Sequence, residues 1–347
     1  MDKTKLCGLT SGEIADLIGK SGFNITHALR ISNSIYKRHI SGIHDIPGIP
    51  RKLREELGSI SVTGLFAPFG SEVSVDKTVK YLFETEDGRK FETVYIPDNK
   101  RNTVCVSSQS GCRMGCPFCV TGRYGFHGNL TAGEIVNQVI SIPEAGTINH
   151  VVFMGMGEPM DNIGQVLKAS RIMTAEWGLA LSPRSITVSS VGITPGIERF
   201  LSETDCNLTV SLFSPFYDER RKVVPVEKKY PSDDIIRMMK SAPRRKKRRL
   251  SLSYVMIKDL NDTDRHLEGL ISLLRDSDIR INLLPYHPVD RDGHISSSAE
   301  RLQFFRHNLV ISGISASVRR SRGSDIAAAC GLLASGLSTV SGQDDSD

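Results

Sequence analysis

The chain of 347 residues is long enough to form one large core with an appendage, or two ordinary domains. Its composition, 39% hydrophobic and 24% charged residues, is typical of a soluble globular protein, and no apolar stretch approaches the roughly 18 residues that a membrane span needs. The start carries early charges and no signal-peptide run, so we expect a cytoplasmic protein. Thiols stay reduced there, so we expect the seven cysteines to be ligands or reactive groups.

The formal net charge of +5 is unevenly distributed along the chain. Residues 220–249 hold thirteen Lys or Arg against Glu227, Asp233 and Asp234, a local excess of thirteen minus three, or +10. The run "RRKKRR" at residues 244–249 is its centre. A concentrated basic patch suits a polyanion such as RNA. The alternative is a solvated basic turn without a partner.

Residues 1–60 predict short amphipathic helices that form a small N-terminal accessory domain. The first helix has Thr10 or Ser11 as its N-cap and ends near Gly22, and a second follows over residues 24–40. Residues 72–96 predict a β-hairpin with Asp87 and Gly88 in its turn. We therefore assign residues 61–97 to a β-hairpin linker.

Residues 98–335 alternate between strand-like and helix-like stretches, which predicts an α/β fold with a parallel sheet, closed or partly closed into a barrel. One helix is expected to begin with a capping box from Thr131 to Glu134. A last unit predicts a strand, a turn at Gly323 and a helix carrying Cys330, and the polar tail at 336–347 predicts disorder. The other strands are expected at 103–108, 150–157, 185–192, 207–213, 250–257 and 281–286.

Reactive groups in such sheets lie at the carboxyl ends of the strands. Several chemically capable residues stand at or just beyond the ends of the predicted strands. We therefore expect one mouth of the barrel to gather Cys112, Gly157, Glu158, Ser189, Ser211 and His287.

Three cysteines stand in one glycine-containing loop, "SSQSGCRMGCPFCVTG", as Cys112, Cys116 and Cys119. Three thiolates at this spacing can hold one metal centre, because the glycines let the backbone bend close to it. Zinc usually takes four protein ligands, and His127 could complete such a site. Three ligands on a 4Fe-4S cluster instead leave one iron open to a substrate or cofactor, and Phe118 could shield that cofactor.

This loop, with an aromatic residue before the third cysteine, resembles the radical S-adenosylmethionine (SAM) enzymes. Other segments in order from about residue 8 to 335 resemble the RlmN and Cfr adenosine methyltransferases. These segments are "FETVYI", "CVSSQSGC", "NLTAGEIVNQV", "FMGMGEPMDN", "ITVSSVGITPGIERF", "VSLFSPFYDERRKVVPV" and "SVRRSRGSDIAAACG". The resemblance implies a partial (β/α)6 radical SAM barrel that methylates carbon 2 of an adenosine. Carbon 8 is the alternative, and Pro159 favours carbon 2 because Cfr has Ala there.

The resemblance also implies roles for individual residues. The cysteines of the loop would hold a 4Fe-4S cluster whose open iron binds SAM, with two SAM molecules used per turnover. Cys330 matches the cysteine that carries the methyl group, and Cys105 matches the resolving cysteine, which leaves a transient disulfide with Cys330. Glu92 matches the general base that takes the proton from the target carbon.

SAM contacts are implied at Gly157, Glu158, Ser189, Ser211 and the backbone of Leu212. Two further SAM-contact positions depart from the family pattern. Phe213 stands where the family has His, and His287 stands where RlmN has Asn. Other residues must then make the polar contacts with SAM, and His287 could compensate for Phe213.

The implied substrate is 23S rRNA, with tRNA as a second substrate, and Arg319, Arg320 and Arg322 are expected to contact phosphates. We further expect a monomer that takes electrons from a low-potential donor such as flavodoxin or ferredoxin. Cys7 and Cys206 match nothing in the family and are expected to be structural. Two alternatives stay open: a radical SAM enzyme of this fold with another substrate, and a zinc-stabilised RNA-binding protein without catalysis.

Overall fold

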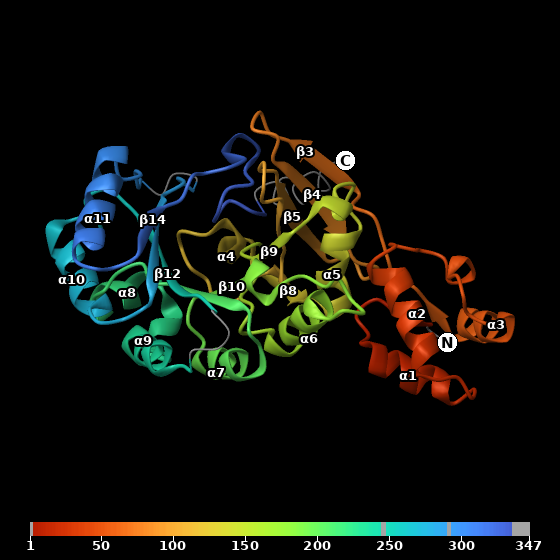
Figure 1. Ribbon diagram of the computed structural model, residues 1–347. Helices are drawn as coiled ribbons and strands as arrows, with labels where there is room; N and C mark the ends of the chain where they lie inside the picture. Colours follow the sequence, from red (N-terminus) through yellow and green to blue (C-terminus); the bar gives the residue numbers. More distant parts are fainter. Residues whose placement is uncertain (1–2, 244–247, 290–292, 335–347) are drawn as a thin grey trace.

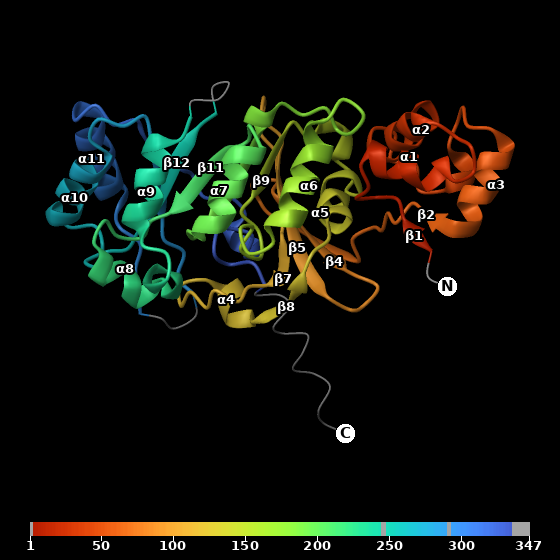
Figure 2. The same ribbon diagram turned by 90° about the horizontal axis from the view of Figure 1, so that it is seen from below.

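The computed structural model describes residues 3–243, 248–289 and 293–334, and these form two parts that lie end to end (Figures 1 and 2). The N-terminal part is helical. Its elements are β1 (Thr4–Lys5), α1 (Ser11–Gly19), α2 (Ile25–Tyr36), η1 (Ile43–Asp45), α3 (Arg51–Ile60) and β2 (Ser61–Val62).

The expected N-terminal helices are confirmed, and their starts follow from side-chain caps. The Thr10 hydroxyl accepts from the backbone N–H of Glu13, whose carboxylate accepts from the Thr10 N–H in return, which is a capping box. Asn24 caps α2 in the same way. Tyr36, at the end of α2, is fully buried and lies against Trp177 of the barrel. The two parts therefore share a packed contact.

Ten strands in the described part of the chain form one sheet, in the order β14-β13-β12-β11-β10-β9-β6-β5-β4-β3. The seven strands from β14 to β6 are parallel, and β5, β4 and β3 continue the sheet antiparallel. The sheet curves without closing, which confirms a partial barrel (Figure 1). The parallel strands are β6 (Thr103–Cys105), β9 (His150–Phe153), β10 (Ile186–Ser190), β11 (Asn207–Ser211), β12 (Leu250–Met256), β13 (Arg280–Pro285) and β14 (Ala316–Val318).

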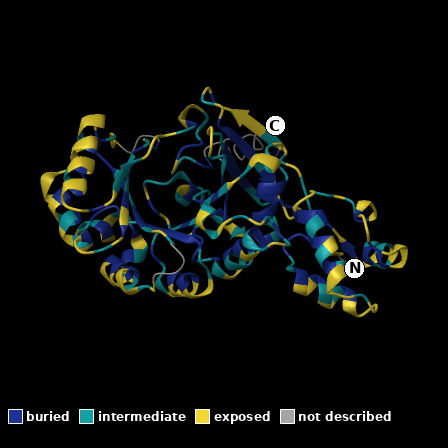
Figure 3. Cartoon of the chain, viewed as in Figure 1, coloured by how far each residue is buried: buried dark blue, intermediate teal, exposed yellow. Residues whose placement is uncertain are grey.

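Helices cover the outer face of this sheet, and the buried residues lie between the two layers (Figure 3). These helices and short 3-10 turns are α5 (Ala132–Ile140), η2 (Ala145–Thr147), α6 (Ile163–Thr174), η3 (Pro183–Ser185), α7 (Thr194–Glu203), α8 (Tyr217–Val223), η4 (Pro225–Lys228), α9 (Ser232–Ser241), α10 (Asp264–Leu274) and α11 (Ala299–Ile311). Among the described residues, no helix combines the length and the apolar character needed to cross a membrane.

The expected β-hairpin is a three-stranded unit, which corrects the prediction from the sequence. Its strands are β3 (Gly70–Val73), β4 (Val79–Glu84) and β5 (Lys90–Ile96). The part of the expected hairpin before Asp87 is divided by a turn at Asp76 and Lys77. Lys77 has a φ of 68°, and the Asp76 carboxylate accepts from the N–H of Thr78. Because β5 pairs with β6, the unit extends the main sheet and is more than a linker.

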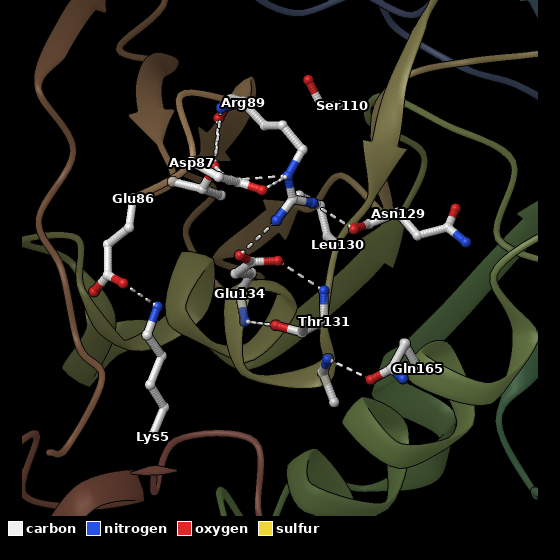
Figure 4. Close-up of polar contacts among 12 residues, drawn as sticks. Lys5, Glu86, Asp87, Arg89, Ser110, Asn129, Leu130, Thr131, Glu134 and Gln165 are labelled. Carbon is white, nitrogen blue, oxygen red and sulfur yellow. Dashed lines mark hydrogen bonds and ion pairs between the residues drawn. The ribbon is translucent and has the colours of Figure 1, made fainter. Parts of the chain in front are cut away.

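The tip of this unit is joined to both parts of the molecule (Figure 4). Arg89 pairs with Asp87 and, at 3.1 Å, with Glu134 of α5, whose capping box with Thr131 is confirmed. Lys5 of the N-terminal part forms an ion pair of 2.9 Å with Glu86. These contacts fix the three-stranded unit against the barrel.

The helix expected to carry Cys330 is absent from the described residues. After β14, a short 3-10 turn, η5 (Ser324–Ile326), ends before the cysteine, and residues 327–334 form a loop. Ala327, Gly331 and Ala334 all have positive φ angles, which a helix excludes. Tertiary contacts thus override the helix propensity of "IAAACGLL". The expected disordered tail lies outside the described residues.

Candidate active site

The cysteine loop follows β7 (Gln109–Gly111), which pairs with β8 (Phe126–Asn129), and it ends at α4 (Val120–Tyr124). Its entry is fixed by Gly111, which has a φ of 74° and no room for a Cβ beside the carbonyl oxygen of Gly125. The next residue, Cys112, donates its N–H to that same oxygen at 2.7 Å. The N–H of Cys119 donates to the carbonyl of Cys116 at 3.2 Å, which turns the chain into α4.

The three thiols of this loop suit a cluster of cationic iron. Burial, with a contribution from the neighbouring thiols, raises the pKa of Cys112 and of Cys116 to about 12. Buried thiolates need a positive partner to offset their desolvation, and bound iron supplies it. In residues 3–243, 248–289 and 293–334, no three His, Cys, Asp or Glu side chains meet at a point that could hold one ion. A 4Fe-4S cluster places each thiolate on a different iron, so its ligands need no single meeting point.

The loop that carries Cys330 packs against the cysteine loop (Figure 1). The N–H of Val120 donates to the carbonyl of Gly331 at 2.8 Å, and the Thr121 hydroxyl donates to the carbonyl of Leu333 at 3.0 Å. Cys330 as a residue is exposed on this loop, but its sulfur is surrounded by the chain. Burial of the sulfur and then the nearby Cys119 thiol raise the pKa of Cys330. The structure thus brings Cys330 beside the predicted cluster ligands.

Cys105 stands at the end of β6 and is buried. Burial, and then the thiol of Cys330, raise the pKa of Cys105 well above its usual range. Cys105 lies opposite Val94 of β5, the strand that also carries Glu92, and the Oε2 of Glu92 accepts from the N–H of Ala334 at the end of the Cys330 loop. In the chain, 225 residues separate the two cysteines, 330 minus 105. Both cysteines therefore lie at one site with the cysteine loop.

Glu92 lies on β5 and is fully buried at this site. Its Oε2 accepts from the backbone N–H of Ala334 at 2.8 Å, next to the Cys330 loop. Its Oε1 has no hydrogen-bond partner among the described residues, and the Nζ of Lys80 lies 3.9 Å away. Burial raises the pKa of Glu92 above its ordinary value. A raised pKa and a free oxygen suit a group that accepts a proton.

Gly157 and Glu158 follow β9, as predicted. Gly157 has a φ of 99°, and a Cβ there would lie 2.5 Å from the Cβ of Gln109, so only glycine fits. The Glu158 carboxylate accepts from the N–H of Met160 at 2.9 Å and from the N–H of Val191 at 2.8 Å. Burial raises the pKa of Glu158 to about 7. The carboxylate therefore ties the ends of β9 and β10 together.

Three predicted SAM contacts lie at the ends of the neighbouring strands. Ser189 is half-buried on β10 and faces the side of the sheet opposite to its buried neighbours. Ser211 ends β11. The next residue, Leu212, donates its N–H to the carbonyl of Ser253 at 2.9 Å and accepts from the Nε of Arg220 at 2.7 Å, so both of its backbone groups already have protein partners.

Phe213 and His287, the two departures from the family pattern, lie in different surroundings. Phe213 has a φ of 66° and stacks on Phe118 with ring centroids 5.5 Å apart. Its carbonyl accepts from the Nδ2 of Asn261 at 2.8 Å. His287 is 2.8 Å from the hydroxyl of Ser321, and burial lowers its pKa. At Phe213 the structure therefore has an apolar aromatic stack.

Arg220 is a residue of the site that the sequence did not reveal. It is fully buried and forms an ion pair with Glu227, which is also buried. Its Nη2 donates to the carbonyl of Ser211 at 2.9 Å and also to that of Val191, so it holds the chain after β10 and β11. The charged run "DERRKVV" gave no sign of burial. Both members of this pair belonged to the predicted basic patch, and neither contributes to its surface.

The remaining basic residues differ in exposure. Residues 244–247 of the run "RRKKRR" lie outside the described residues. Arg249, Arg319 and Arg320 are exposed, whereas Arg322 is half-buried and 3.8 Å from the carboxylate of Asp76. Arg248 donates to the carbonyl of Leu201, in the last turn of α7, and to the carbonyl of Thr204, the residue after that helix.

Known proteins with similar sequences and folds cover almost the whole chain. A family model described as the Radical SAM superfamily matches residues 106–274. A probable dual-specificity RNA methyltransferase RlmN from Parabacteroides distasonis is 41% identical over 333 residues, which are 96% of this chain and 97% of that protein. The dual-specificity RNA methyltransferase RlmN of Syntrophotalea carbinolica is 36% identical over 337 residues, 97% of this chain and 91% of that protein. The crystal structure of a radical SAM methyltransferase from Sphaerobacter thermophilus has a TM-score of 0.88 and 36% identity, and covers 95% of this chain and 99% of its own.

Proposed function

Because this chain belongs to the RlmN family of radical SAM methyltransferases, we propose that it methylates carbon 2 of an adenosine in 23S rRNA, and also of a tRNA. The chain is a SAM-dependent radical RNA methyltransferase whose cofactors are a 4Fe-4S cluster and SAM. Cys112, Cys116 and Cys119 would hold the cluster, which would supply the electron for the reductive cleavage of SAM.

The observation that carries this proposal is that the Cys330 loop contacts both the cysteine loop and Glu92, on the strand that pairs with the strand of Cys105. An adenine sp2 carbon is a poor nucleophile, so the methyl group needs a carrier on the protein. Cys330 takes this role as a thiolate that accepts a methyl group from SAM. Cys330 is exposed whereas Cys105 is buried, so Cys330 can reach a large substrate such as RNA.

The chain's own residues then release the product. The methyl group on the Cys330 sulfur would give one hydrogen atom to the radical derived from SAM; its carbon would then bond to the adenine carbon, and Glu92 would take the proton from that carbon. The Cys105 thiolate attacks the Cys330 sulfur, so an S–S bond forms and the S–CH2 bond breaks. The released carbon would take a proton to become a methyl group, and the one electron left over would return to the cluster, which balances the electron used to cleave SAM.

Further parts of the proposal concern selectivity and partners. Pro159 supports carbon 2, because Cfr has Ala at that position. The exposed Arg319 and Arg320 follow β14 and lead into the Cys330 loop, which supports contacts with RNA phosphates there. We place the enzyme in the cytoplasm as a monomer that receives electrons from flavodoxin or ferredoxin.

The decisive test is the modified nucleoside that the enzyme makes. Anaerobically reconstituted protein is incubated with 23S rRNA fragments, tRNA and SAM, and nucleosides are identified by mass spectrometry. We expect 2-methyladenosine. Active enzyme that forms 5'-deoxyadenosine but leaves both carbon 2 and carbon 8 unmethylated would contradict the proposal.

The two-cysteine mechanism has its own test. Cys330→Ala is expected to abolish methyl loading of the protein, whereas Cys105→Ala is expected to accumulate protein covalently bound to RNA. Cys206→Ala, at another buried cysteine outside the site, serves as the matched control and is expected to do neither. Equal turnover in all three variants would refute the mechanism.

A further inference from the structure

One buried pair of charges holds both ends of the segment that carries Cys330, here called the Cys330 segment (residues 326–334). At its start, the Nζ of Lys80 donates to the carbonyl of Ile326 at 2.8 Å. At its end, the Oε2 of Glu92 accepts from the N–H of Ala334 at 2.8 Å. Lys80 and Glu92 are themselves paired, with 3.9 Å between Nζ and Oε1. The cysteine thus lies in the middle of a segment closed at both ends by one ion pair.

The sheet explains how two distant residues can act together. Lys80 lies opposite Val94, and Leu82 lies opposite Glu92, in the antiparallel pairing of β4 with β5. Lys80 and Glu92 are therefore diagonal neighbours on the same face of the sheet. Side chains in this arrangement are within reach of each other, and both point toward the Cys330 segment.

The Cys330 segment depends on these contacts for its shape. Three of its nine residues, Ala327, Gly331 and Ala334, have positive φ angles, and two of these are alanines, for which such angles are strained. After η5 ends at Ile326, no regular element continues through the segment. A strained segment persists only where surrounding contacts hold it.

The burial of Lys80 also needs an explanation. Its side chain is 2% exposed and that of Glu92 is not exposed at all. A buried ammonium group is costly unless negative groups lie close to it. Here Glu92 and the half-exposed Glu72, whose Oε2 is 3.2 Å from Nζ, supply that charge. A purely structural contact with one carbonyl oxygen would not require a cation.

We propose that Lys80 is a positioning residue for carbon transfer: it keeps Glu92 as a carboxylate and, with Glu92, holds the Cys330 segment in register with Cys105 and the cysteine loop. This inference rests on the proposed function for the roles of Glu92 and Cys330. The contact between the ion pair and the segment stands independently of that function, and so can be tested separately.

The first test measures the segment itself by hydrogen exchange of the full-length protein. Lys80→Met removes the donor to Ile326 and the partner of Glu92, so amide exchange in residues 326–334 is expected to rise about tenfold or more. Lys77→Met makes the same chemical change on the exposed turn before β4 and is the matched control. Exchange at the wild-type rate in Lys80→Met would overturn the proposal.

The second test is the pH profile of carbon transfer. The charged or titratable groups that face Glu92 are Lys80 on β4, Glu72 on β3 and Tyr124 on α4. The positive charge of Lys80 lowers the pKa of Glu92, so its removal raises that pKa. The acid limb of the profile is therefore expected to move to higher pH by about one unit or more in Lys80→Met.

A merely structural role would lower the rate equally at every pH, and that result would overturn the proposal. If Lys80→Met does not fold, Lys80→Gln removes the charge but keeps an amide donor for Ile326, and the same shift is expected. Lys80→Arg retains the charge and should keep the acid limb at its wild-type position. Wild-type protein that never carries a methyl group on Cys330 would instead refute the proposed function, while the exchange result would still decide the ion-pair contact.

Discussion

Replacing Arg220 with methionine tests how the site is held together. The change leaves Glu227 buried without its cationic partner and removes the donors to the carbonyls of Val191, Ser211 and Leu212. Breaking one side of a buried ion pair costs about 3–5 kcal/mol. We therefore expect Arg220→Met to lower the free energy of unfolding by about 4 kcal/mol. The proposed SAM site should lose its geometry as well, because these carbonyls lie at or just beyond the ends of β10 and β11.

The assay is urea unfolding of ligand-free protein, followed by circular dichroism and by the fluorescence of Trp177, the single tryptophan. Arg221→Met is the matched control, because that side chain is 46% exposed, pairs with the exposed Asp218 and lies over the exposed ring of Tyr217. It is expected to change the free energy of unfolding by less than about 0.5 kcal/mol. If Arg220→Met is within about 1 kcal/mol of wild type, the assigned role of the pair is wrong.

A double-mutant cycle separates the ion pair from the other contacts. Glu227 also accepts from the N–H and hydroxyl of Ser232 at the start of α9, and Glu227→Gln keeps an acceptor for them. The double variant Arg220→Met with Glu227→Gln has no isolated buried charge. Its loss of stability is expected to be smaller than the sum of the single losses by about 2 kcal/mol. Additive losses would show that the charges do not interact.

Three further results are expected. Gly157→Ala should lose at least about 2 kcal/mol in urea unfolding, because its Cβ would overlap Gln109 and its φ of 99° is strained for alanine; an unchanged midpoint would contradict this. Phe213→Ala should lose the stack on Phe118, weakening SAM binding in calorimetry, and an unchanged Kd would show that the aromatic wall does not contact SAM. Methyl loading of Cys330 should rise about tenfold per pH unit between pH 6 and pH 8, since its raised pKa leaves little thiolate there; a flat profile by mass spectrometry would show another limiting step.

The parallel strands could be predicted because each is a short run of β-branched and apolar residues between turn signals. The rule that reactive groups follow the carboxyl ends of parallel strands agrees with the positions of Glu158, which follows β9, and Ser211, which ends β11. Cys112 instead follows β7, a strand of the separate two-stranded sheet. The N-caps at Thr10 and Thr131 were predictable for the same local reason.

The failures share a physical cause, which is that distant contacts overrode local preference. The sequence around Cys330 favours a helix, but Lys80 and Glu92, about 240 residues away, hold it as a loop. Arg220 appears as part of a basic surface run, although a glutamate seven residues later allows it to be buried. No pattern within one window of sequence carries information of this kind.

The hydrogen bond from Ala334 to Glu92 spans 242 residues, and this sets an order of events during synthesis. β4 and β5 emerge early, and at about 5–20 residues per second the end of the Cys330 segment follows on the order of ten seconds or more later. Until then the Glu92 carboxylate lacks the N–H donor of Ala334, and Cys330 is not held beside it. This contact can therefore form only after the strands of the barrel have been synthesised, and under the proposed mechanism a nascent chain cannot begin chemistry before then.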